Sequence, residues 1–198
     1  MPHAFNVTRA GADAFIKFGI ERGEIMVRAL KRADQRLHRS ADTGGLILPA
    51  AALDLEGFRL AEADAGKLVY GYAAGLDMTR RDLQLAAREQ GRPWDLGKDF
   101  ENSAVCSEIV PAGELGVLGK GRISLAVNGE TKQSSDIDKL IWNIPELIAD
   151  LSRFYHLEPG DLIYTGTPEG VGAVQPGDRI TGRIEGVGEV SLTIGGAE

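Results

Sequence analysis

The segment from Leu157 to Asp178, LEPGDLIYTGTPEGVGAVQPGD, constrains the backbone more than any other part of the chain. Its Pro159-Gly160 pair indicates a turn, and the DLIY run that follows favours a strand. The strand leads into a glycine-rich loop, where the backbone can approach a ligand closely. The hydroxyl groups of Thr165 and Thr167 can hydrogen-bond a carboxylate or carbonyl oxygen. On residue types alone, a tight turn between two strands is the better explanation of this loop.

The length of 198 residues is sufficient for one domain of ordinary size with its own hydrophobic core. Cys106 is the single cysteine, which excludes an intramolecular disulfide framework and fits a reducing compartment. No run of residues approaches transmembrane length, and the N-terminus lacks the apolar stretch of a signal peptide. We therefore expect a cytoplasmic protein that does not bind membranes.

The formal net charge of -7 argues against a nucleic-acid binder. The charge is unevenly distributed along the chain. Residues 1–40 contain eight Arg and Lys against four Asp and Glu, a net of +4, whereas the remainder contains 14 basic and 25 acidic residues, a net of -11. The N-terminal segment therefore differs in character from the rest.

The N-terminal segment has two interpretable patterns. Residues 21–39 place apolar side chains on one face and basic ones opposite, which predicts an amphipathic helix packed on its own domain with a solvated basic face. A membrane or an acidic partner is the alternative for such a helix. Within residues 40–60, the alternation of Leu53 and Leu55 with polar neighbours indicates a strand-like piece.

A strand beginning with residues 68–72 is expected to run into Asp77, which should lie at the strand's end. Residues 80–89 then contain good helix formers, so Arg81 and Gln84 fall about one turn apart on one helix face. This spacing brings a cation and an amide beside the carboxylate of Asp77. On sequence alone, a surface role in which Asp77 caps the helix is the stronger interpretation.

Later segments give clear local signals. Lys98 follows Gly97, a hinge that brings the lysine toward the region of Asp77, although by itself Lys98 would be a surface lysine. Residues 122–133 alternate around Asn-Gly, the strongest short signal for a hairpin. Residues 141–155 predict an amphipathic helix entered through Asn143, with Phe154 among its buried residues.

Two further segments, residues 178–184 and 189–194, are expected to pair as strands around Gly186. Strands dominate, helices are few, and strand and helix do not alternate regularly. The fold class that follows is α+β with a β-rich core.

Two blocks of sequence resemble the fumarylacetoacetate hydrolase family, metal-dependent enzymes that act on short diketo and oxo acids. The first is PGDLIYTGTPEGVG followed by PGD, within the segment that ends at Asp178. The second is YGYAAGLDMTRRDLQLAAREQGRPWDLGKDF, residues 70–100, in which GLDMTRRDLQ and GRPWDLGK are similar to the fumarylpyruvate hydrolases of that family. The resemblance covers residue 62 to the end and leaves residues 1–60 as an atypical segment before a fumarylacetoacetase-like region at 61–198.

The resemblance implies a mixed β-sheet roll with flanking helices, commonly in a homodimer. It also implies hydrolysis of a carbon-carbon bond in an acylpyruvate such as fumarylpyruvate, to fumarate and pyruvate, in the breakdown of aromatic compounds. Mg²⁺ or Mn²⁺ would chelate adjacent substrate oxygens. Family relatives also decarboxylate or isomerise oxo acids, and these reactions remain open.

The resemblance assigns roles to five residues. Asp77 matches a metal-binding aspartate, and Lys98 matches a lysine that stabilises developing negative charge at the catalytic centre. Arg81 and Gln84 match the pair that contacts the substrate, and Thr167 matches a threonine that holds a substrate oxygen.

This chain also departs from the family pattern. The family has a Glu-x-Glu metal pair about thirty residues before the aspartate, where this chain reads TGGLILPAAALD, and its N-terminus lacks the family's water-activating stretch. Other carboxylates near that region could substitute as ligands: Asp54 with Glu56, or Glu62 with Asp64.

Three hypotheses explain this difference: a reading-frame or gene-start artefact, an inactive paralogue with a structural or interaction role, or a rewired metal site.

Overall fold

The computed structural model describes residues 16–20, 23–28 and 43–196. The strands are β1 (Ile16–Ile20), β2 (Gly23–Arg28), β3 (Thr43–Leu53), β4 (Val69–Arg80), β5 (Ala104–Cys106), β6 (Val110–Pro111), β7 (Arg122–Val127), β8 (Glu130–Asp136), β9 (Leu162–Tyr164), β10 (Ala173–Val174), β11 (Arg179–Ile184) and β12 (Gly188–Thr193). The helices are α1 (Glu62–Ala65), η1 (Gly66–Leu68), α2 (Arg81–Glu89), α3 (Asp95–Lys98), α4 (Ala112–Leu115), η2 (Ile137–Lys139) and α5 (Ile144–Ser152).

The strands form two sheets. The larger has the order β1-β2-β9-β3-β4-β5, with β10 paired to β3 and β6 paired to β4, and the smaller has the order β12-β11-β7-β8. Every strand pairing that the structure describes is antiparallel. The α+β class with a β-rich core is therefore confirmed.

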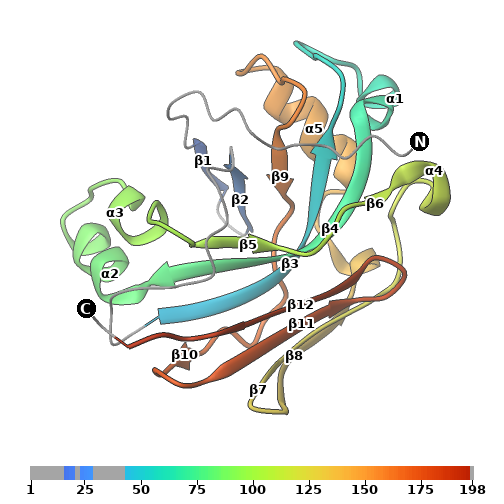
Figure 1. The fold of residues 1–198 in the computed structure, drawn as a ribbon. Coiled ribbons are helices and arrows are strands. Elements are labelled where there is room, and N and C mark those ends of the chain that lie inside the picture. Colours follow the sequence, from blue (N-terminus) through green and yellow to red (C-terminus); the bar gives the residue numbers. More distant parts are fainter. Residues whose placement is uncertain (1–15, 21–22, 29–42, 197–198) are drawn as a thin grey trace.

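Figure 1 shows the smaller sheet lying against β3 and β4 of the larger one. The two sheets approach closely at Gly182 of β11, where an added Cβ would lie 2.5 Å from Cδ1 of Ile47 in β3. The main core fills the space between the sheets, and it includes Ile47, Leu76 and Ile180, each with no exposed surface. A second, smaller apolar cluster around Leu48 and Tyr164 also involves β3 and β4. Long stretches of β3 and β4 are therefore buried on both faces.

Two helices matter for the site. α2 and α3 lie together at the end of β4 (Figure 1), so the chain passes from this strand directly into the helix that carries Arg81 and Gln84. Helix α5 has a capping box in which Asn143 accepts a hydrogen bond from the backbone N–H of Glu146. This cap fixes the start of the helix one residue after Asn143.

Among the described residues, none of the helices has the length and apolar character needed to cross a membrane.

Several local predictions are confirmed. The hairpin turns at Asn128-Gly129 between β7 and β8, and β11 pairs with β12. Asn128 has a positive φ of 51°, which asparagine tolerates better than most residues. The helix predicted at 80–89 begins one residue later, at Arg81.

Other predictions are wrong. Residues 23–28 of the predicted N-terminal helix form strand β2, which pairs with both β1 and β9. Pairing on both sides outweighs a helical pattern of apolar residues. The rest of that prediction, residues 21–22 and 29–39, lies outside the described residues.

Three smaller corrections concern the ends of elements. Strand β3 ends at Leu53, so the expected strand-like piece around exposed Leu55 is absent from the structure described. β4 continues past Asp77 to Arg80, because β3 provides pairing partners up to Thr43. Phe154 follows the end of α5 and is 53% exposed, so it is not part of that helix's buried face.

Candidate active site

Asp77 lies on β4 of the larger sheet, between β3 and β5, and is 3% exposed. Its partners across the two neighbouring strands are Leu46 on β3 and Ala104 on β5. In antiparallel pairs, directly opposite residues share one face of the sheet and are close neighbours. Neither neighbour has a polar side chain, so the partner of this carboxylate must come from outside the sheet.

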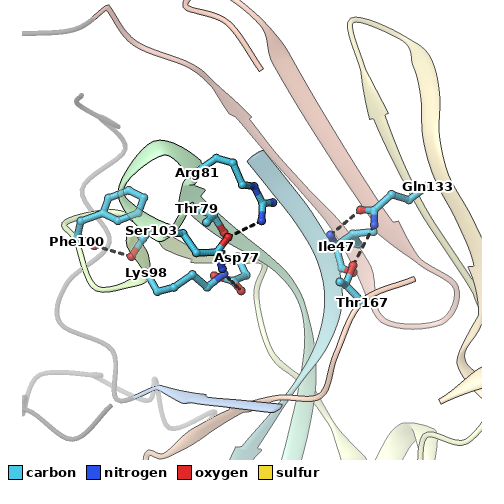
Figure 2. A network of polar contacts seen from close by, with 10 residues as sticks. Ile47, Asp77, Thr79, Arg81, Lys98, Phe100, Ser103, Gln133 and Thr167 are labelled. Carbon is cyan, nitrogen blue, oxygen red and sulfur yellow. Dashed lines mark hydrogen bonds and ion pairs between the residues drawn. The ribbon is translucent and has the colours of Figure 1, made fainter. Parts of the chain in front are cut away.

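Lys98 supplies that partner from α3. Its Nζ donates a hydrogen bond of 2.7 Å to Oδ2 of Asp77 and another of 2.7 Å to Oγ1 of Thr79 (Figure 2). The side chains of Lys98 and Asp77 are 6% and 4% exposed. We call Asp77, Thr79 and Lys98 the charged cluster. Lys98, which by itself was predicted to be a surface lysine, is therefore the buried counter-ion of Asp77.

Gly97 explains how α3 reaches the sheet. A Cβ at this position would lie 2.9 Å from the backbone nitrogen of Gln84 and 3.0 Å from the carbonyl oxygen of Arg80. Only a residue without a side chain allows α3 to lie so close to the first turn of α2. This contact places the next residue, Lys98, within hydrogen-bond distance of Asp77 and Thr79.

The other predicted pair lies on α2. Arg81 Nη1 donates a 2.6 Å hydrogen bond to Oε1 of Gln84, whose side chain is buried. The amide of Gln84 therefore orients the guanidinium group of Arg81, which follows Thr79 by two residues in the chain. This geometry suits a planar cation that binds a carboxylate through two parallel hydrogen bonds.

One buried oxygen of the charged cluster is unsatisfied. Oδ1 of Asp77 has no hydrogen-bond partner among the described residues, although its companion Oδ2 binds Lys98. A buried acceptor without a donor is rare in folded proteins and costs free energy. The charged cluster thus keeps one carboxylate oxygen that has no hydrogen-bond donor among the described residues.

Thr167 belongs to a different group of contacts. Its hydroxyl donates to the carbonyl oxygen of Ile47 at 2.8 Å and accepts from Nε2 of Gln133 at 3.1 Å. The same Gln133 accepts from the backbone N–H of Ile47 at 3.1 Å and donates to the carbonyl of Pro168 at 2.7 Å. Figure 2 shows this group and the charged cluster on opposite sides of β3. We call Gln133, Thr167 and the Ile47 backbone the amide cluster.

The loop of the amide cluster is held to β3 at a second point. Thr165 donates through both its hydroxyl and its backbone N–H to the carbonyl of Pro49. Gly170 lies so close to the carbonyl oxygen of Lys132 that a side chain would collide with it. The loop borders a pocket of about 300 Å³ whose lining includes Thr167, Glu169 and Asp136.

Comparison with known proteins decides the assignment of this chain. The model of the fumarylacetoacetate (FAA) hydrolase C-terminal family matches residues 50–195. The chain belongs to the fumarylacetoacetate hydrolase family.

Two family members with known names are similar to this chain. A fumarylpyruvate hydrolase from Ralstonia sp is 67% identical over 147 residues, which cover 74% of this chain and 76% of the relative. The crystal structure of fumarylpyruvate hydrolase from Pseudomonas aeruginosa, in complex with Mn²⁺ and pyruvate, has a TM-score of 0.79 at 46% identity. That match covers 82% of this chain and 71% of the Pseudomonas chain.

Similarity extends to a solved structure of nearly equal length and to tautomerases. A crystal structure from Burkholderia cenocepacia has a TM-score of 0.82 at 33% identity. The match covers 100% of this chain and 98% of the Burkholderia chain. The oxaloacetate tautomerase FAHD1 of Rattus norvegicus is 40% identical over 153 residues, 77% of this chain and 66% of the relative. Members of the fumarylacetoacetate hydrolase family with this degree of similarity thus carry different reaction names.

The described residues do not fit the divalent cation that the family resemblance implies. Mg²⁺ and Mn²⁺ prefer several oxygen ligands, with carboxylates prominent among them. Among the residues that the structure describes, no group of three or more His, Cys, Asp and Glu side chains is placed to hold a metal. The alternative carboxylates do not fill the gap, because all four are exposed: Asp54, Glu56, Glu62 and Asp64. We therefore assign no chemical step to a cation.

Sequence reasoning missed two residues of the charged and amide clusters, Thr79 and Gln133. Thr79 shares a strand face with Asp77 because it follows two residues later, and this alternation was available from the sequence. Gln133 was assigned only to a hairpin, and no signal in its neighbours indicated that its amide would be buried against β3 and the loop.

Proposed function

We propose that this chain is a hydrolase that cleaves a carbon-carbon bond in an acylpyruvate such as fumarylpyruvate, giving pyruvate and fumarate. The 67% identity to the Ralstonia fumarylpyruvate hydrolase carries the proposal. The charged cluster supports it, because Asp77, Thr79 and Lys98 all lie within the residues that match the family model.

The proposed chemistry assigns tasks to Lys98, Arg81 and Gln84. The oxygen of water bonds to the acyl carbonyl carbon and the carbon-carbon bond breaks, with its electron pair leaving on the pyruvate fragment as an enolate. Of the two protons that the water gives up, one balances the proton taken up by the enolate carbon to form pyruvate, and the other is released as the acyl fragment leaves as the fumarate carboxylate. The ammonium group of Lys98 stabilises this developing negative charge. The guanidinium group of Arg81, oriented by Gln84, binds a terminal carboxylate of the substrate.

Thr167 requires a rearrangement to take part. Its hydroxyl hydrogen is already donated to the carbonyl of Ile47. Thr167 can hold a substrate oxygen, as the family resemblance implies, only after this bond is exchanged for one to the substrate. A homodimer completes the proposal, on the same resemblance, and the assay below compares turnover with Mn²⁺, with Mg²⁺ and with EDTA.

The test is release of pyruvate from fumarylpyruvate, followed through NADH consumption by lactate dehydrogenase, in Mn²⁺, Mg²⁺ and EDTA. We expect turnover by the wild type and a loss in kcat of about 100-fold or more for Lys98→Met, because a preorganised positive charge is removed. The matched control is Lys120→Met, which alters an exposed lysine and should leave kcat unchanged. Equal rates for both variants would refute the role of Lys98.

A second candidate function is a family member without turnover that retains ligand binding. The observation that favours it is the placement of Leu46 directly opposite Asp77, where no ligand oxygen is available. It predicts no pyruvate release from acylpyruvates in any metal condition, together with measurable binding of oxalate, a mimic of enolpyruvate, by calorimetry. Turnover of fumarylpyruvate would exclude it.

A further inference from the structure

The pairing of β3 with β4 determines which side chains can share a ligand with Asp77. Leu46 is the direct partner of Asp77, and Leu48 is the direct partner of Gly75. The register is continuous here, since its single irregularity falls between Ala52 and Leu53. Because side chains alternate along a strand, positions 46 and 48 lie on the sheet face from which Asp77 projects.

These two positions of β3 are close enough to Asp77 to share a cation with it. Directly opposite Cβ atoms in an antiparallel pair are about 4.5–5.5 Å apart, and a diagonal neighbour is within reach of a long side chain. Carboxylates at both positions would therefore converge with Asp77 on one ion. In this chain both residues are leucines, and Leu48 is buried in the apolar cluster that includes Tyr164.

The charges lead to the same conclusion. Asp77 and Lys98 are a buried pair whose charges sum to zero, at a distance of 2.7 Å. A divalent cation on Asp77 would leave a net charge of +2 in a desolvated site, and it would be repelled by the Lys98 ammonium. Two more carboxylates would restore neutrality. The leucines thus remove both the ligands and the charge that a cation requires.

We infer that Lys98, and not a resident divalent cation, is the counter-ion of Asp77 in this chain, and that Leu46 and Leu48 of β3 decide this. The charged cluster is therefore a carboxylate–ammonium site whose unsatisfied oxygen, Oδ1 of Asp77, accepts a hydrogen bond from a bound molecule. Cation binding and turnover are separate measurements, so this inference and the proposed hydrolase activity can fail independently.

The first experiment titrates the purified, metal-stripped wild-type chain with MnCl₂ in a calorimeter, beside the variant Asp77→Asn. We expect no saturable binding at Asp77, so the two titrations should be the same. Stoichiometric Mn²⁺ binding by the wild type that Asp77→Asn abolishes would overturn the inference. This experiment needs no variant of the leucines.

The second experiment introduces the missing ligands. The double variant Leu46→Glu/Leu48→Glu should gain a saturable Mn²⁺ site, about 100-fold or more tighter than any residual binding by the wild type, because affinity for hard cations rises steeply with the number of carboxylate ligands. The matched control is Leu46→Gln/Leu48→Gln, whose side chains have nearly the same size without the charge and should show no such gain. A folded double Glu variant with wild-type affinity would contradict the role given to the leucines.

Thermal unfolding with and without Mn²⁺ covers the case in which the double Glu variant is unstable. Two buried carboxylates without a cation should lower the melting temperature, and Mn²⁺ should raise it again because an ion that binds only the folded state stabilises that state. The Gln control should not respond to Mn²⁺. An identical response in both variants would place the ion elsewhere and overturn the assignment.

Discussion

The charged cluster and the amide cluster lie on opposite sides of β3 and differ in how well their polar groups are satisfied. In the amide cluster, Gln133 bonds to the Ile47 N–H and the Pro168 carbonyl, and Thr167 both donates and accepts. In the charged cluster, Oδ1 of Asp77 lacks a partner among the described residues. A satisfied network stabilises one backbone arrangement, whereas an unsatisfied acceptor leaves a position for a ligand. We therefore regard the amide cluster as the support of the loop and the charged cluster as the chemical centre.

The largest expected effect comes from breaking the charged cluster. Lys98→Met leaves Asp77 buried without its counter-ion and should lower the free energy of unfolding by about 3–5 kcal/mol. Urea denaturation measures this loss. The double variant Asp77→Leu/Lys98→Met removes both charges and should recover most of it, since a buried apolar pair carries no desolvation cost. A double variant as unstable as Lys98→Met alone would show that the ion pair is not the cause.

Next in size is the amide cluster. Gln133→Met keeps the approximate volume of the side chain but leaves the Ile47 N–H and the Pro168 carbonyl without this partner, which should cost about 2–3 kcal/mol. Urea denaturation again gives the value. The control Gln90→Met changes an exposed glutamine and should stay within about 0.5 kcal/mol of the wild type. Equal losses for the two variants would mean that Gln133 is dispensable.

A smaller effect tests how the charged cluster is assembled. Gly97→Ala forces α3 away from the backbone of Arg80 and Gln84, and this overpacking should cost about 1–2 kcal/mol. Because Lys98 moves with α3, kcat for pyruvate release should fall as well. The control Gly119→Ala adds a Cβ that meets no atom within 4 Å, so neither quantity should change. Unchanged kcat in a destabilised Gly97→Ala variant would separate helix packing from the position of Lys98.

The smallest effect lies outside both clusters, at Asp161, a partly buried carboxylate just before β9. Burial raises the pKa of Asp161 above its ordinary value, against the lowering effect of a hydrogen bond from the Glu158 N–H. A carboxyl with a raised folded pKa binds protons more tightly when folded, so its ionisation destabilises the protein as pH rises from its unfolded pKa through its folded pKa.

Asp161→Asn removes this ionisation and keeps an acceptor for the Glu158 N–H. Relative to the wild type, the variant should therefore become more stable as pH rises from the ordinary Asp range toward neutrality, by urea denaturation at a series of pH values. A difference between the two proteins that does not change with pH would contradict the raised pKa.

Much of the local structure could be predicted from short stretches of sequence. The Asn128-Gly129 turn and the Asn143 cap are each specified by residues within a few positions of one another, so their signals survive in isolation. The pairing of Arg81 with Gln84 follows in the same way from helical spacing. Strand β2 was mistaken for a helix because its pairing with β1 and β9 is not visible in its own residues.

By itself, the sequence determined the family and the α+β class and gave the candidate site residues, because these depend on motifs of consecutive residues and on composition. The tertiary structure alone decided what those residues contact. It placed Leu46 opposite Asp77, buried Lys98 as the counter-ion, and joined Gln133 to the Thr167 loop. Each of these results depends on the register or packing of segments far apart in the chain, where a shift of one residue would move a side chain to the other face.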